Sequence, residues 1–536
     1  MPNIRRISPL IAVLASIAVV LPASSTTAAA RGRISLEVIG TFRTGVFAES
    51  AAEIVAHDPE SQRLFVVNAN AGVVDILDIE DPTSPEKVGV IEPGDLGAQI
   101  NSVDIDDGVV AVAIEPHPNQ NPGRVAFYDT AGVLLSDVQV GSLPDMLTFT
   151  PDGSKVVVAN EGEPDGYCAG GVDPPGSVSI IDLSGGAAGV EQSDVATASF
   201  ERFNKQRDRL VRRGVRIFGP GATVAQDLEP EYVAVAKNSS RAWVSLQENN
   251  ALAVVNLSRA RVTDILSLGL KDHSRRNRGI DASDDDGEIN IQRWPVRGVY
   301  MPDALDAIKH KGRQFILSAN EGDARDYECF AEEERVEDVT LDESVFEDAD
   351  ELQQEASLGR LTVTTTAPQN RDGEFQELHA FGGRSFSVWN ASGRLVFDSG
   401  DDFEQVTADA LPEDFNSDNE ANDSFDNRSD NKGPEPEAIE IGQVGSRTYA
   451  FIGLERVGGV MIYDVQNPRK PRFVDYVNNR DFDGDPEADT AGDLGPEGLT
   501  LIADSDSPNG RPLLVVANEV SGSTTIYEVR GQNKAR

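Results

Sequence analysis

Short apolar runs separated by turn-forming residues recur along almost the whole chain. Each run holds four to six residues rich in Val, Ile, Leu and Phe, and Gly, Pro, Asp or Asn bounds it. Runs of this length and composition predict β-strands. Three of them, within 156–168, 315–329 and 513–529, end in the same dipeptide, Asn-Glu, which indicates a repeated architecture.

A larger repeat contains these strands. Seven times, a polar or acidic step precedes a short strand, a turn follows, and a second strand ends in an amide or an acid. The first strands begin at Glu53, Asn101, Asp145, Glu231, Asp303, Glu437 and Glu497. The second strands end at Asn70, Glu115, Glu161, Glu248, Glu321, Glu455 and Glu519. A third strand and usually a weaker fourth strand follow.

Four antiparallel strands per repeat are typical of a β-propeller blade, so we predict an all-β fold, a seven-bladed β-propeller of four-stranded blades. Six or eight blades are the alternatives. The last repeat offers only three strands, and the segment that starts at Ile34, ahead of the first repeat, has no partner of its own. We expect this N-terminal strand to complete the final blade, which closes the ring and removes a free sheet edge.

Segments that break the repeat set the domain boundaries. Residues 1–30 combine Arg5 and Arg6 with an apolar stretch and small residues, the layout of a secretory signal peptide. Residues 31–536 are then expected to form a single propeller domain. Two partly helical insertions are predicted at about 186–226 and 322–381. The acidic segment 401–433 by itself would be a flexible loop, which a bound cation could order.

The charge of the chain limits its partners. A formal net charge of −43 predicts a protein that repels nucleic acid and anionic membranes and attracts cations. The simpler alternative is that this charge only provides solubility. No apolar run is long enough to span a bilayer comfortably. We expect a monomer, secreted or periplasmic, that acts on a small phosphorylated substrate or binds another extracellular ligand.

Propeller geometry should bring the acidic strand ends together. The innermost strand of a blade starts near the central axis at one face, and the second strand returns to that face, so both sets of acids should converge on one mouth of the channel. Crowded carboxylates coordinate cations, take up protons or pair with basic side chains. The predicted metal ligands are Glu161, Asp303, Glu321, Glu437 and Glu497. The alternative for each is a structural role, accepting backbone N–H groups from the next blade.

Two further features concern a cation and the cysteines. The loop 481–498 places Asp481, Asp483 and Asp485 at alternate positions around a glycine, so that their carboxylates could converge on calcium. The alternative is a solvated acidic turn. Cys168 and Cys329 each follow an Asn-Glu-Gly tip. A matching pair in an exported protein predicts one disulfide, and the alternative is two free thiols.

Long motifs in the chain, among them DLEPEYVAVAKNSSRAWVSLQENNALAVVNL, RSDNKGPEPEAIEIG and LGPEGL, resemble the choice-of-anchor I family of exported bacterial proteins. The resemblance extends over about residues 36–530 and implies a propeller. Some relatives occur in chains labelled alkaline phosphatase or nucleotidase, which implies phosphatase-like activity. The acidic strand ends are also similar to those of propeller phytases, in which calcium ions and basic residues gather phosphate.

Two hypotheses of function follow. The enzyme hypothesis is calcium-dependent phosphoester hydrolysis, with Ca²⁺ at the mouth and charge stabilisation by Arg384, Lys432, Arg456 and Lys271. The alternative is a non-catalytic, calcium-stabilised scaffold for ligand binding or adhesion. A redox propeller is disfavoured because the chain contains no Cys-x-x-Cys-His motif.

Overall fold

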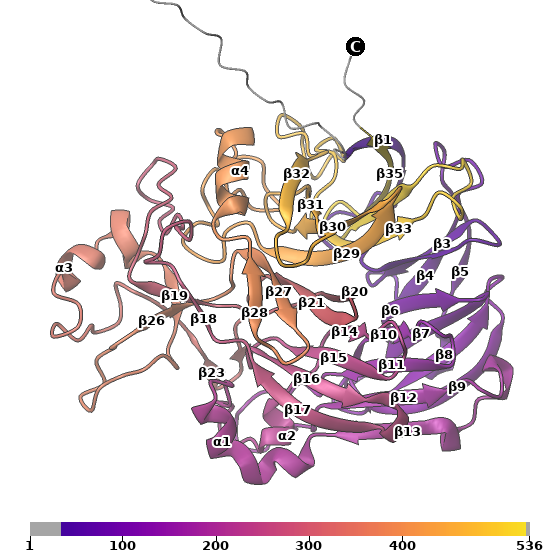
Figure 1. Cartoon of the computed structure of the whole chain (residues 1–536), viewed down its shortest axis with the longest axis horizontal. Coiled ribbons are helices and arrows are strands. Elements are labelled where there is room, and N and C mark those ends of the chain that lie inside the picture. The colour runs from indigo at the N-terminus through magenta and orange to yellow at the C-terminus, as the bar shows by residue number, and fades with distance from the viewer. Residues whose placement is uncertain (1–33, 532–536) are drawn as a thin grey trace, which may run out of the picture.

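The computed structural model describes residues 34–531, and most of its strands lie in seven four-stranded antiparallel sheets (Figure 1). In chain order, the first three sheets contain β2 (Val55–Asp58), β3 (Arg63–Asn68), β4 (Val73–Asp78) and β5 (Glu86–Ile91); β6 (Gln99–Asp106), β7 (Val109–Glu115), β8 (Pro122–Asp129) and β9 (Leu134–Ser142); and β10 (Pro144–Phe149), β11 (Lys155–Asn160), β12 (Ser177–Asp182) and β13 (Val195–Ser199). The predicted signal peptide lies outside the described residues.

The remaining four sheets follow the same strand order. They contain β14 (Val233–Val235), β15 (Arg241–Leu246), β16 (Ala251–Asn256) and β17 (Arg261–Ser267); β20 (Leu305–His310), β21 (Arg313–Asn320), β27 (Ser385–Asn390) and β28 (Leu395–Asp398); β29 (Pro436–Val444), β30 (Arg447–Leu454), β31 (Val460–Asp464) and β32 (Arg472–Val477); and β33 (Pro496–Ile502), β34 (Leu513–Asn518), β35 (Ser523–Gly531) and β1 (Ile34–Arg43).

The seven sheets follow one another around the molecule. The first strand of each sheet contacts the first strand of the next, from β2 through β6, β10, β14, β20 and β29 to β33, and β33 in turn contacts β2. Figure 1 shows β10, β14 and β20 near the middle and β9, β13 and β17 toward the edge. Neighbouring sheets bury apolar side chains between them, as Leu64 and Val66 do against Ile502 and Val515. This propeller-like arrangement agrees with the predicted all-β fold class.

The N-terminal strand is the fourth strand of the seventh sheet, as predicted. β1 pairs antiparallel with β35, from Ile34 opposite Gly531 to Arg43 opposite Ser523, with a bulge between Val38 and Gly40. The pairing joins the two ends of the described chain within one sheet. It covers the outer edge of β35, which would otherwise expose its backbone groups for pairing.

The first predicted insertion, 186–226, contains less helix than expected. The sequence predicts helix from Val195, but Val195–Ser199 form β13 because they pair with β12 and complete the third sheet. Such tertiary pairing readily overrides local propensity. The helical parts are short: η2 (Ala187–Gly189), η3 (Gln192–Asp194), η4 (Glu201–Gln206), α1 (Arg207–Arg212) and α2 (Val224–Asp227).

The second predicted insertion, 322–381, supplies part of a five-stranded sheet beside the seven others, at the left of Figure 1. In sheet order its strands are β18 (Leu270–Asp272), β19 (Val296–Val299), β26 (Leu378–Ala380), β25 (Thr362–Thr364) and β24 (Glu333–Arg335). A β-ribbon of β22 (Asp326–Tyr327) and β23 (Phe330–Ala331) and the helical segments α3 (Ala349–Leu352) and η6 (Glu355–Gly359) complete the insertion. Its helix is again shorter than predicted.

The acidic segment 401–433 begins with a helix, α4 (Asp402–Ala410), which the sequence did not predict. Phe403 of α4 is fully buried and lies near the rings of Phe386 and Tyr463, so this apolar contact fixes the start of the segment. Two short 3-10 helices, η1 (Gly94–Leu96) and η5 (Leu257–Arg259), lie elsewhere. Within residues 34–531, no helix is long and apolar enough to cross a membrane.

Candidate functional site

The acidic strand ends form clusters of carboxylates where neighbouring sheets meet, and three of these clusters share no member with one another. A fourth group, Glu321, Glu435 and Glu455, shares Glu321 with one of the three. In each cluster, one carboxylate oxygen of every member lies within 4.8 Å of those of the other two members. Cluster A consists of Glu161, Glu231 and Glu248; cluster B of Asp303, Glu321 and Glu437; and cluster C of Glu53, Glu497 and Glu519. We call the three clusters together the acidic mouth. All five acids predicted as mouth ligands, Glu161, Asp303, Glu321, Glu437 and Glu497, belong to it.

The asparagine of each Asn-Glu tip fixes the strand end that presents the glutamate. Asn160, Asn320 and Asn518 are at most 1% exposed. Their side-chain amides donate hydrogen bonds to serine hydroxyls of the third strand, as Asn160 Nδ2 does to Ser179 Oγ at 3.0 Å and Asn320 Nδ2 to Ser387 Oγ at 2.9 Å. The asparagine is therefore structural. The glutamate that follows it is left to face the mouth.

A second set of acids joins neighbouring sheets. Three residues beyond the predicted strand starts Asn101, Asp303 and Glu437, acidic side chains accept hydrogen bonds from backbone N–H groups of the next sheet. These acids are Asp104, Asp306 and Glu440. Phe149 N donates to Asp104 at 2.8 Å and Ile441 N donates to Asp306 at 3.1 Å. Leu501 N donates to Glu440 at 3.4 Å. Accepting backbone N–H groups from the next sheet is the structural role considered above for the acids at the predicted strand starts. The acids three residues further along the chain perform this role instead.

The acids at the strand starts lack such partners. One buried carboxylate oxygen of each of Glu231, Glu437 and Glu497 has no hydrogen-bond partner among residues 34–531. The register of the strands shifts at these starts, between Pro436 and Ile439 in β29 and between Pro496 and Gly498 in β33. A bulge changes the direction of a side chain relative to the regular strand, so it separates the mouth acid from the residues that follow it in the sheet.

Burial makes ionisation of the mouth unfavourable. It raises the pKa values of Glu231, Glu437 and Glu497 well above their usual range, and neighbouring carboxylates add to the effect. Burial, then the charge of Glu519, raises the pKa of Glu53 from 4.5 to about 8. At neutral pH these groups must hold protons or be neutralised by cations. Carboxylate oxygens without partners are ligands that calcium prefers.

Two basic side chains already neutralise part of the mouth. Lys432 Nζ lies 3.1 Å from Glu321 Oε1 in cluster B and 3.0 Å from Glu435 Oε2. Arg456 pairs with Glu435 at 3.2 Å and with Glu455 at 3.0 Å. Although burial favours the neutral form of Glu435, the charges of Lys432, Arg456 and Arg428 lower its pKa to about 2. These contacts place two of the predicted phosphate-binding cations beside the clusters.

The other two predicted cations have structural partners. Lys271 is 1% exposed, and its Nζ donates to the carbonyl oxygens of Gly383 at 2.7 Å and Gly400 at 2.6 Å and pairs with Asp398. Arg384 is 3% exposed and donates to Glu404 and to three backbone carbonyls. Their donors therefore fix loops, and neither residue is placed to contact a substrate at the mouth.

The predicted calcium loop is an exposed acidic turn. Asp481, Asp483 and Asp485 are exposed, and none of them belongs to a carboxylate cluster within residues 34–531. Asp481 Oδ1 accepts from the backbone N–H of Asp483 at 3.1 Å, and Asp485 Oδ1 accepts from that of Ala488 at 3.2 Å. The structure does not bring the three carboxylates together.

The structure contains a buried ion-pair network next to cluster A that the sequence analysis did not predict. Arg325 is 1% exposed, and its guanidinium pairs with Asp227 and, at 2.6 Å, with Glu229. Glu229 and Glu435 occupy equivalent positions, two residues before the start acids Glu231 and Glu437. The repeated tripeptide Glu-Pro-Glu is therefore the sequence signal that could have identified both.

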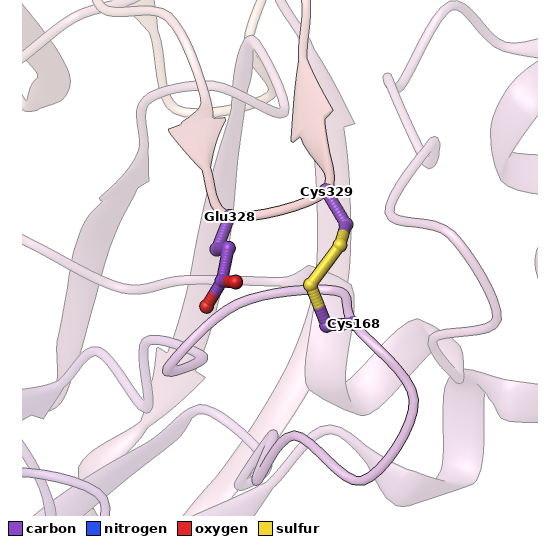
Figure 2. Close-up of side chains that lie close together, drawn as sticks. All are labelled: Cys168, Glu328 and Cys329. Atoms are coloured by element: carbon purple, nitrogen blue, oxygen red, sulfur yellow. A yellow bond between two sulfur atoms is a disulfide. The ribbon is translucent and has the colours of Figure 1, made fainter.

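Cys168 and Cys329 form a disulfide between the loops that follow β11 and β22 (Figure 2). Their Cα atoms lie 5.3 Å apart. Figure 2 shows Glu328 beside the bridge, but the two sulfurs are bonded to each other and offer no thiolate to a metal. Beside the bridge, Tyr327 Oη donates to Glu163 Oε1 at 2.7 Å. The disulfide thus links two tip loops next to cluster A.

A small polar cavity adjoins cluster C. Its volume is about 290 Å³, and Ser50, Asn419, Glu455, Arg456 and Glu519 are among its lining residues. Arg456 contributes a positive charge and Glu455 and Glu519 negative charges to the wall. The cavity therefore offers room for a small polar group within reach of both a basic side chain and the carboxylates.

The four-stranded sheets and the acidic mouth define an all-β, propeller-like protein with carboxylates concentrated where its sheets meet. The chain belongs to the choice-of-anchor I domain family, whose family model matches residues 53–468. This match confirms the family to which the sequence motifs pointed.

Two named proteins are similar over parts of their lengths. The chain is 31% identical over 195 residues to Gigasin-3a of Magallana gigas, a match that covers 34% of this chain and 67% of that protein. It is 28% identical over 319 residues to the mesenchyme-specific cell surface glycoprotein of Strongylocentrotus purpuratus, covering 51% of this chain and 40% of that protein. A solved chain of Kuenenia stuttgartiensis hydrazine synthase is similar at a TM-score of 0.45 and 12% identity, covering 91% of this chain and 99% of that chain.

Proposed function

We propose that the protein is an exported, seven-bladed β-propeller whose acidic mouth binds calcium ions. The partnerless carboxylate oxygens of Glu231, Glu437 and Glu497, one in each cluster, carry this proposal. The contact between β33 and β2 supports a closed ring of seven blades. Export is supported by the family and by the predicted signal peptide, and one relative is named a cell surface glycoprotein.

The donor set of the mouth fits calcium better than a transition metal. Each cluster offers three carboxylates and no imidazole or thiolate. Hard oxygen ligands of this kind suit calcium, whereas zinc and copper sites usually include nitrogen or sulfur. Burial and other carboxylates, without a compensating basic group, dominate the environment of Glu231 in cluster A, and the same holds for Glu437 in cluster B and Glu497 in cluster C.

We place phosphoester hydrolysis at this mouth. Bound calcium would neutralise the carboxylates, attract the phosphate and lower the pKa of a coordinated water. Lys432 and Arg456 are the residues of the chain that would stabilise negative charge on the phosphate, since both lie beside the clusters. The cavity next to Arg456 would receive a small phosphorylated group.

A non-catalytic scaffold is the second candidate. The clusters join residues of neighbouring sheets, as Glu53 of the first sheet meets Glu497 and Glu519 of the seventh. A calcium ion there would hold the sheets together without any reaction. In this case the partner is an extracellular ligand rather than a phosphorylated substrate.

One set of assays separates these candidates. The protein is stripped with EDTA, supplied with calcium, and tested for hydrolysis of p-nitrophenyl phosphate and phytate and for a rise in melting temperature. Glu437→Gln and Glu497→Gln should weaken calcium binding by at least about tenfold and abolish turnover. Glu60→Gln, at an exposed position, is the matched control.

Each outcome has a defined meaning. Calcium-dependent turnover that both mouth variants lose supports the hydrolase. A rise in melting temperature without turnover favours the scaffold and overturns the hydrolase. If wild-type protein shows neither calcium-dependent turnover nor calcium-dependent stabilisation, the calcium site itself is refuted.

A further inference from the structure

A second set of partnerless oxygens, apart from the three clusters, belongs to two residues of the acidic segment and to Asp281. Asp281 Oδ1, Asn416 Oδ1 and Asp426 Oδ2 are buried atoms without a hydrogen-bond partner in the part of the chain that the structure describes. The residues are 0%, 0% and 1% exposed. Three buried acceptors without donors are costly in an apolar surrounding, so their occurrence in one region requires an explanation.

Two residues tie these oxygens to one place. The Ser429 hydroxyl accepts from Asn416 Nδ2 at 2.8 Å and donates to Asp426. The Arg384 guanidinium donates to the carbonyl oxygen of Ser429 at 2.8 Å and to that of Asp281 at 2.7 Å. Asn416 and Asp426 therefore both contact Ser429, and Arg384 bridges the backbone of Ser429 and that of Asp281, although 145 positions separate Asp281 from Asp426 in the sequence.

Arg384 does not neutralise these oxygens. Its donors already serve the carbonyl oxygens of Asp281, Ser429 and Asn431 and the carboxylate of Glu404. Burial raises the pKa of Asp426 to about 8, and the neighbouring charge of Asp281 adds to the rise. Both carboxylates are buried, and neither forms an ion pair with a basic side chain within residues 34–531.

We propose that Asp281, Asn416 and Asp426 form a second divalent-cation site, distinct from the acidic mouth and selective for a hard ion such as calcium. Two carboxylates and an amide carbonyl are oxygen ligands of the kind found in protein calcium sites. One cation would satisfy all three oxygens. If the carboxylates were protonated instead, the amide oxygen of Asn416 would gain a donor only if one of these protons pointed toward it.

The position of the site connects it to the mouth. The same acidic segment carries Asn419, whose Nδ2 donates to Glu455 Oε1 at 3.0 Å and whose Oδ1 accepts from Arg456 at 2.9 Å. It also carries Lys432, which pairs with Glu321 of cluster B. A cation held by this segment would fix the side chains that it places against the mouth.

Calcium titration of the EDTA-treated full chain by calorimetry tests this site. Asp426→Asn keeps the size of the side chain and removes its charge, and Asp423→Asn, exposed in the same segment, is the matched control. We expect Asp426→Asn to lose one calcium equivalent and Asp423→Asn to lose none. Glu437→Gln and Glu497→Gln should retain this equivalent, so failure of the mouth proposal remains distinguishable.

Terbium luminescence provides a second measurement if Asp426→Asn does not fold. Trp294 Nε1 donates to the carbonyl oxygen of Ile280, the neighbour of Asp281, at 3.2 Å, so Trp294 should sensitise Tb³⁺ bound at this site. We expect Trp294→Phe to lose a component of the emission that calcium displaces. Full calcium stoichiometry in folded Asp426→Asn, or unchanged emission in Trp294→Phe, would overturn the proposal.

Discussion

The stability of the calcium-free protein should fall as the pH rises through the neutral range. The size of this fall in stability can be worked out for Glu53, because its pKa rises from 4.5 to about 8 in the folded protein. The folded state then holds a proton that the unfolded state has released, so the stabilisation is complete below pH 4.5 and is lost as the pH approaches 8. Between pH 5 and pH 8.5 this group alone lowers the free energy of unfolding by about 4 kcal/mol.

Calcium should reverse this loss, because a bound cation replaces the protons that the carboxylates hold. Asp145, whose pKa burial raises from 3.8 to about 7, should contribute in the same direction. Urea unfolding at pH 5 and pH 8.5, each with EDTA or with calcium, measures the effect. Calorimetry in two buffers of different ionisation enthalpy should show proton release when calcium binds at pH 7.

The control for this prediction is Glu53→Gln, which cannot titrate. Between pH 5 and pH 8.5 its free energy of unfolding should fall by about 4 kcal/mol less than that of the wild type. The exposed Glu60→Gln should behave as the wild type. The reasoning is refuted if the calcium-free wild type is equally stable at both pH values, or if Glu53→Gln retains the full pH dependence.

Three further predictions concern the framework. Arg325→Met leaves two buried carboxylates unpaired and should lower the free energy of unfolding by about 3–5 kcal/mol, whereas the exposed Arg275→Met should cost less than about 1 kcal/mol. Equal losses in urea unfolding would contradict this. Asp306→Ala removes the acceptor of a backbone N–H of the next sheet and should cost about 1–3 kcal/mol; a melting temperature equal to that of wild type would exclude the role. The double variant Cys168→Ser, Cys329→Ser opens a bridge across a sequence separation of 161 residues, which predicts a loss of up to about 5 kcal/mol. An unchanged unfolding midpoint under reducing and oxidising conditions would argue against a bridge in solution.

Local sequence patterns predict most of the fold. Four-stranded repeats and the pairing of β1 with β35 could be predicted because strand composition and the turn residues between strands are visible in the chain. The sequence predicts helix at Val195–Ser199 because the residues that follow are basic and helix-forming, and only the pairing with β12 makes this segment a strand. The parallel pair β19 and β26 joins segments far apart in the sequence, and no local pattern indicates such a pairing.

The site was predictable in its residue types but not in its grouping. The spacing of acids at strand ends led to Glu161, Glu437 and Glu497, and all three lie in the acidic mouth. Their division into three clusters depends on how neighbouring sheets are rotated against each other, which the sequence does not encode locally. Lys271 and Arg384 lie near strand starts in the chain, yet backbone carbonyls and acids of folded loops take up their donors.

The contrast between two acids of one strand is the strongest argument that the mouth has a function. Glu437 and Glu440 both lie in β29, and both are buried enough for their pKa values to rise. Glu440 accepts a hydrogen bond from the next sheet, whereas one buried oxygen of Glu437 has no hydrogen-bond partner among the described residues. A buried acid without a partner costs stability, and a glutamine at that position would avoid the charge. Equivalent acids without partners recur at Glu231 and Glu497, so packing alone does not explain them, whereas cations bound at the mouth would.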